Sequence, residues 1–261
     1  MGDAAFRVVV LTCSDIGFET ADMIADTPGI DVAAVVLAPH RRGSFRSRLR
    51  TLVRRRGPIG AAVFILRRVA ERVERTGPAP LERTTAGVPV LRFNDFHDAE
   101  CITELERMAP DLGVVDGTYI LRESIFDLPR LGSINLHCGK VPEFRGSPPA
   151  FWELYHGVDH VGITIHRVAA KLDAGPILAE ESFPLDLAPS GDPAAWVDRY
   201  WRDVLRPNGI RMLAATAAML AAGTACERSQ PAWSGKPNRT PSHGEVKALR
   251  RIVMQRRTSS S

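Results

Sequence analysis

The sequence lacks the features that mark secreted or membrane-spanning chains. Only four of its 261 residues are cysteine and none forms a CxxC pair. We therefore expect neither a zinc knuckle nor a redox motif, and a reducing cytoplasm is the simplest compartment. No apolar run reaches the roughly 20 residues that a membrane span needs, and the best candidate, Met212 to Ala222, predicts a buried helix. The N-terminus has no basic leader followed by a separate apolar segment, so no secretory signal is expected.

The net charge of the whole chain is small, but two of its segments are strongly basic. The net charge is +4, yet Arg41 to Arg75 holds twelve arginines and two glutamates, a net of +10. Glu227 to Ser261 holds eight Lys or Arg and two Glu, a net of +6, so the remaining residues sum to −12. We expect an acidic body with two basic segments. These segments either contact an anionic substrate, RNA, membrane surface or neighbour, or form a solvated helical face and a tail.

The hydrophobic pattern predicts a mostly parallel sheet flanked by helices. Buried strand-like runs alternate with helical stretches at residues 7–12, 18–25, 32–37, 99–108, 112–115 and 133–136. This alternation favours a Rossmann-like α/β fold, which binds ligands at the carboxyl ends of its strands. After Gly162 the pattern changes, and residues 163–168 and 176–183 predict an antiparallel edge. The first turn, CSDIGFE, lacks GxGxxG, so no dinucleotide cofactor is expected.

Two polar side chains near the end of a predicted strand are candidates for a catalytic role. Asn135 and His137 are two residues apart, so on a strand they project from the same face. An asparagine amide stabilises an oxyanion, and a histidine takes up or donates a proton. Asp173, in a predicted loop, is placed to orient that histidine. On spacing alone, a hydrogen-bonded core histidine and a turn aspartate remain the simpler interpretation. Cys138 is a poor nucleophile candidate, because strand neighbours face opposite ways.

A series of linked motifs resembles the formyltransferase family. The motifs occur in the family's order and comprise Asn135-x-His137, Pro142, Arg145-Gly146, Gly162-Ile-Thr-Ile and Leu172-Asp-Ala-Gly175. The resemblance is close over residues 110–179 and looser over the N-terminal half. The family includes methionyl-tRNA formyltransferase, glycinamide ribonucleotide formyltransferase and the sugar N-formyltransferases. Residues 147–155 look more like the sugar-modifying members, and little chain remains for the second, β-barrel domain of the tRNA enzyme.

The resemblance implies N10-formyltetrahydrofolate as formyl donor, a primary amine as acceptor, and no metal. It assigns the catalytic roles to Asn135, His137 and Asp173. It places the donor against two walls, formed by Gly117, Thr118, Tyr119, Ile120 and Leu121 and by Ala170, Lys171 and Leu172. For the acceptor, we expect a small, phosphorylated or nucleotide-linked sugar or a natural-product intermediate. Its contacts are expected from Arg145, Gly146 and Trp152.

The expected organisation is one catalytic domain over residues 1–226 and a basic C-terminal extension over 227–261. The domain includes a basic helical insertion at about 41–85, for which we favour packing on the body, and the extension ends in a short helix at 246–257. Two other functions remain open: a formyltetrahydrofolate hydrolase, and a non-catalytic protein that binds RNA or another anion. The oligomeric state also remains open, a homodimer included.

Overall fold

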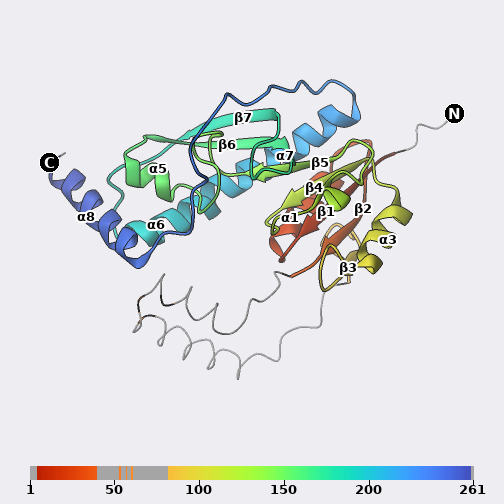
Figure 1. The fold of residues 1–261 in the computed structure, drawn as a ribbon, viewed down its shortest axis with the longest axis horizontal. Coiled ribbons are helices and arrows are strands. Elements are labelled where there is room, and N and C mark those ends of the chain that lie inside the picture. The colour runs from red at the N-terminus through yellow and green to blue at the C-terminus, as the bar shows by residue number, and fades with distance from the viewer. Residues whose placement is uncertain (1–4, 40–52, 54–56, 58–59, 61–81, 260–261) are drawn as a thin grey trace.

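The structure is a computed structural model that describes residues 5–39, 53, 57, 60 and 82–259. Its centre is a seven-stranded sheet in the order β3-β2-β1-β4-β5-β6-β7 (Figure 1). Five strands run parallel: β1 (Phe6–Thr12), β2 (Ile30–Leu37), β3 (Val90–Arg92), β4 (Leu112–Asp116) and β5 (Ser133–His137). The last two, β6 (His160–Arg167) and β7 (Ile177–Pro184), are antiparallel. The predicted Rossmann-like sheet with an antiparallel edge is therefore confirmed.

Helices cover both faces of the sheet because its central strands are apolar on both sides. In β1, residues Val8, Val9 and Val10 are all 0% exposed. Val8 and Val10 face a cluster that includes α1 (Ile16–Ala25) and α7 (Arg206–Ala221), whereas Val9 faces a second cluster with α3 (Ala99–Met108). This alternation with period two places the core on both faces of one strand.

The remaining described helices are α4 (Glu123–Phe126), α5 (Phe151–His156), α6 (Pro193–Tyr200), the π-turn η1 (Trp201–Leu205) and α8 (His243–Ser259). Of these, α5, α6 and α8 lie at the end of the molecule opposite β3 and α3 (Figure 1). The predicted buried helix at Met212 to Ala222 is confirmed as the C-terminal part of α7. The predicted insertion at 41–85 lies almost wholly outside the described residues. Across the described parts of the chain, no helix combines the length and apolarity needed to cross a membrane.

The C-terminal extension packs on the body. The segment after α7 runs back across the side of the sheet that carries β7, and α8 then lies beside α5 and α6 (Figure 1). Its arginines meet internal partners: Arg250 pairs with Asp192 at 2.6 Å, and Arg256 donates to the carbonyl of Leu154 at 2.7 Å. Part of the positive charge that marks this extension is therefore used for docking α8.

A buried carboxyl group in α5 makes the stability of the fold depend on pH. Glu153 is 2% exposed, and burial raises its pKa from 4.5 to about 8. The folded state thus binds this proton more tightly than the unfolded state. The stabilisation is full below the unfolded pKa and is lost as the pH rises through the folded one.

We therefore expect Glu153→Gln, which cannot ionise, to unfold like the wild type near about pH 5. Near about pH 9, its free energy of unfolding should exceed that of the wild type by on the order of 4–5 kcal/mol. Urea titrations of both proteins at the two pH values measure this difference. An equal pH dependence in the two proteins would show that Glu153 does not carry it.

Candidate active site

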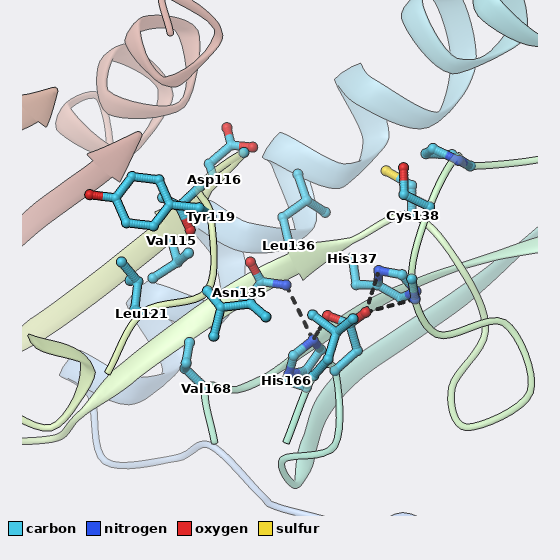
Figure 2. A pocket seen from close by; sticks show the side chains of 18 of the residues that line it. Val115, Asp116, Tyr119, Leu121, Asn135, Leu136, His137, Cys138, His166 and Val168 are labelled. Carbon is cyan, nitrogen blue, oxygen red and sulfur yellow. Dashed lines mark hydrogen bonds and ion pairs between the residues drawn. The ribbon is translucent and has the colours of Figure 1, made fainter. Parts of the chain in front are cut away.

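A cavity of about 890 Å³ opens at the carboxyl ends of β4 and β5, with the antiparallel strand β6 along its side (Figure 2). Ligands bind at this edge of the sheet in open α/β folds. Its volume lies within the range of small-molecule sites. The walls come from the ends of these strands, from the loops after β4 and β6, and from two positions in the C-terminal extension, Asn238 and Thr240.

The three predicted catalytic residues meet in this cavity. Asn135 and His137 lie on β5 and share one face, as their spacing predicts. Asp173 reaches them from the loop between β6 and β7, and its Oδ2 is 3.6 Å from His137 Nδ1. The His137 and Asp173 side chains are only 8% and 9% exposed. Residues far apart in sequence are thus brought together in a largely desolvated site.

The protein fixes which nitrogen of His137 carries a proton in the neutral ring. Nε2 lies 2.8 Å from the carbonyl oxygen of Phe144, an acceptor, so Nε2–H donates to it. Nδ1 is then the nitrogen that faces Asp173. Gly139 permits this contact, because a Cβ there would collide with both His137 Nε2 and the Phe144 carbonyl. Burial lowers the pKa of His137, and the charge of Asp173 only partly opposes that shift. The resting imidazole is therefore neutral.

Asp173 is held ionised in an uncommon backbone conformation. Its φ of +48° lies in the left-handed region, which aspartate enters more readily than most residues. Burial raises the pKa of Asp173, but its contacts with His166 and His137 and the hydrogen bond from the Gly146 amide outweigh that effect and bring it to about 2. The Gly146 N–H donates to Oδ2 at 2.8 Å. A negative charge is thus fixed beside a neutral histidine.

A second histidine, which was not predicted from the sequence, lies in the site. His166 lies on β6, which pairs with β5 so that His166 stands opposite Asn135. Its Nδ1–H donates to the Arg167 carbonyl at 2.7 Å, which leaves Nε2 to accept from the Asn135 amide at 3.2 Å. The second amide hydrogen of Asn135 remains for a ligand. The alternation in GITIHRV places His166 on one face of a strand but does not identify its neighbour.

The C-terminal extension also supports the site. The Gln230 side chain donates to the carbonyl oxygens of Asp173 at 2.9 Å and Gly175 at 2.7 Å. Its own oxygen accepts from the Arg145 guanidinium. Asn238 forms a parallel bridge with Gly146 and contributes to the cavity wall. One side chain of the extension thus ties together the two loops that hold Asp173.

The structure brings most of the predicted donor-binding residues to the cavity. The loop after β4 contributes Gly117, Thr118, Tyr119, Ile120 and Leu121, and the opposite loop contributes Ala170 and Leu172. Lys171 lies outside the lining. The first loop is anchored from behind, since the Tyr119 hydroxyl donates to Asp95 at 2.6 Å and accepts from the Phe96 amide at 2.8 Å.

Of the three residues predicted to contact the acceptor, one lines the cavity and two lie outside the lining. Gly146 lines the cavity, but Arg145 and Trp152 do not. Arg145 is bound to Gln230 and lies 5.2 Å from the ring centre of Trp233. The Trp152 indole is 7% exposed and donates to a backbone carbonyl at 3.0 Å. In this arrangement both side chains support the wall from behind.

The Cys138 thiol, which also lines the cavity, is not a reactive nucleophile near neutral pH. Burial raises the pKa of the Cys138 thiol to about 12, so it holds no thiolate near neutral pH. Within the part of the chain that the structure describes, no group of three or more His, Cys, Asp or Glu side chains is arranged to hold a metal ion. The groups available for chemistry near β5 are the Asn135 amide, the His137 and His166 imidazoles and the Asp173 carboxylate.

At its carboxyl edge the Rossmann-like sheet carries an asparagine, a histidine and an ionised aspartate, side chains of the kinds that can exchange a proton or donate to an oxyanion. Residues 65–192 match the family model described as formyl transferase. Through this segment the chain is similar to the formyl transferase family.

Individual relatives agree with this similarity. The chain is 31% identical over 185 residues to the methionyl-tRNA formyltransferase of Geobacter sulfurreducens. These residues make up 70% of this chain and 56% of that protein. It is 36% identical over 140 residues to the methionyl-tRNA formyltransferase of Syntrophus aciditrophicus, covering 52% of this chain and 45% of that one. The chain thus spans about half the length of these curated relatives.

Solved structures share the fold. A glycinamide ribonucleotide transformylase from Symbiobacterium toebii superposes with a TM-score of 0.56 at 20% identity, over 87% of this chain and 94% of that one. A sugar N-formyltransferase from Shewanella sp FDAARGOS_354 gives a TM-score of 0.55 at 13% identity, over 90% and 76% of the two chains. At these identities the likeness concerns the fold alone.

Proposed function

We propose that this protein is an N-formyltransferase that moves a formyl group from N10-formyltetrahydrofolate to a primary amine. The observation that carries the proposal is the meeting of Asn135, His137 and Asp173 at one cavity, with the carboxylate Oδ2 3.6 Å from the imidazole Nδ1. The family match over residues 65–192 supports the reaction class.

The shape of the cavity supports a flat, partly apolar donor. Ile120, Leu121, Val168 and Leu172 line the cavity and give it an apolar part that suits the faces of a bicyclic ring. Backbone groups of residues 117–121 lie at the same part and supply hydrogen bonds to the ring edge. The donor's formyl group then lies toward Asn135, where the free amide hydrogen points.

The described side chains divide the work of transfer. As the acceptor amine adds to the formyl carbon, negative charge builds on the formyl oxygen and the Asn135 amide donates to it. The amine becomes acidic at the same moment, and the neutral Nδ1 of His137 takes its proton. The imidazolium formed in this way is stabilised by Asp173, and it returns the proton to the departing nitrogen. No covalent bond to the protein forms.

The acceptor we propose is a small amine, such as a phosphorylated or nucleotide-linked amino sugar or a natural-product intermediate. The two alternatives keep the same fold. A hydrolase would admit only water to the acceptor side, whereas a non-catalytic RNA or anion binder would use the basic segments without folate turnover. The size of the cavity favours transfer over hydrolysis. We place the reaction in the cytoplasm, because all four cysteines are free thiols.

Calorimetric titration with a stable 5-formyl folate, followed by turnover of N10-formyltetrahydrofolate with a panel of amines, tests the proposal. We expect binding at one site per chain and amine-dependent release of tetrahydrofolate. Release that is equally fast without amine would identify a hydrolase. Absence of binding at high ligand concentration would exclude the folate reaction and leave anion binding.

A further inference from the structure

The cavity continues over the edge of the sheet to its other face. Neighbouring residues of a strand project to opposite faces, so Leu136 points away from Asn135 and His137. Asp116 ends β4 one residue after Val115, which pairs with Asn135. Figure 2 shows Asp116 and Leu136 on the side of β5 away from His166. Cys138, Trp201 and Arg206 also line the cavity.

A buried ion pair forms the polar floor of the cavity on this side. The Arg206 guanidinium donates from Nη1 to Asp116 Oδ2 at 2.7 Å, and the two side chains are 7% and 5% exposed. Nη2 donates to the Ile16 carbonyl and to Thr20 Oγ1, and the Thr20 hydroxyl donates to the same Oδ2. Nε lies 3.7 Å from Glu19. The positive charge of Arg206 is thus engaged on every nitrogen.

The carboxylate of Asp116, in contrast, is engaged through one oxygen. The bonds from Thr20 and Arg206 both end on Oδ2. Within the described parts of the chain, Oδ1 receives no bond, and it is not among the buried oxygen atoms that lack a partner. Since Asp116 lines the cavity, Oδ1 is the oxygen that the cavity meets. An acceptor atom that faces a binding site and has no hydrogen-bond partner in the protein discriminates for ligands that donate to it.

We propose that Asp116 is a specificity-determining residue that reads a second hydrogen-bond donor, a hydroxyl or an amine, on the acceptor molecule. This inference rests on the proposed formyl transfer and extends it. The donor folate occupies the side of β5 with Asn135 and His137, so the acceptor approaches over Leu136, past Asp116 and Arg206. A simple monofunctional amine leaves Oδ1 unpaired and is used poorly.

The test compares amines that differ by one hydroxyl group. The probes are cyclohexylamine and the 2-, 3- and 4-aminocyclohexanols, whose reacting amines are otherwise alike. The variant is the double substitution Asp116→Leu with Arg206→Met, which removes both charges together and so avoids leaving one of them buried and unpaired. The matched control removes the exposed pair Arg211–Glu181, also anchored on α7, by Arg211→Met with Glu181→Leu.

We expect the wild type to favour at least one aminocyclohexanol over cyclohexylamine by about 100-fold in kcat/KM, and the variant to lose that preference. Binding of 5-formyl folate should stay unchanged in the variant, and the control should retain the preference. Equal use of all four amines by the wild type, or use of none while folate still binds, overturns the role of Asp116. A preference that survives the double substitution does the same. Failure to bind folate instead overturns the proposed function itself.

Discussion

Replacing His137 by alanine is expected to lower kcat for formyl transfer by about 10³-fold, the typical contribution of a positioned acid–base group. The reason lies in Nδ1, which is unprotonated in the resting site and faces Asp173 at 3.6 Å. Without it, the proton released by the attacking amine loses the imidazole that is positioned to accept it. Single-turnover rates with N10-formyltetrahydrofolate and a saturating amine measure the effect.

The His137 variant should still bind the donor, because the walls at Ile120 and Leu172 are untouched. Calorimetry with 5-formyl folate separates this outcome from loss of folding. His160→Ala is the matched control, since His160 is an exposed histidine paired with Asp159 at 2.9 Å and should show wild-type turnover. A His137→Ala enzyme that keeps its rate would remove the imidazole from the mechanism.

The architecture was largely predictable because its signals are local. The run of valines in β1 and the alternation in β6 each reveal a strand from a few neighbouring residues. The elements that were missed are β3, α4 and α5, all of six residues or fewer. Such short segments complete less than two helical turns or only one strand alternation, so periodicity carries no information about them.

The site residues likewise differ in whether a local sequence pattern reveals them. Asn135 and His137 follow from their spacing on one strand, and the resemblance supplied Asp173. His166 depends on the register between β5 and β6, which strand patterns alone do not fix. Arg206 pairs with Asp116 across 90 positions of the chain, a contact that no local pattern encodes.

The C-terminal extension contributes to the site in a way that its composition does not reveal. Its basic character left open contact with an anion or a solvated tail, whereas in the structure Asn238 lies in the cavity wall and Gln230 holds the backbone of Asp173. The charge of this segment indicates how it meets solvent, whereas its contribution to the site comes from single amide side chains such as Gln230. We therefore propose that residues 227–259 act with the catalytic body in forming the cavity.

The second large effect is expected from Asp173→Asn. This change preserves the size of the side chain and one oxygen for the Gly146 amide but removes the charge, whose pKa of about 2 keeps it ionised at every working pH. That charge raises the pKa of His137 against the effect of burial. The neutral amide withdraws this support, so the imidazolium formed during transfer loses its counter-ion. We expect kcat to fall by about 100-fold or more.

The pH profile tells whether the lost charge acts through His137. If neutral His137 accepts the proton, kcat rises with pH through its pKa, and the variant moves this acid limb to lower pH because its imidazole protonates less readily. The ionisation of the free acceptor amine appears in kcat/KM and not in kcat, so it does not contribute to this limb. Asp159→Asn, made in the exposed Asp159–His160 pair, is the matched control and should leave the profile in place. An acid limb that stays fixed in Asp173→Asn would separate the aspartate from the histidine, and a limb of opposite slope would make His137 an acid that is protonated before the amine attacks.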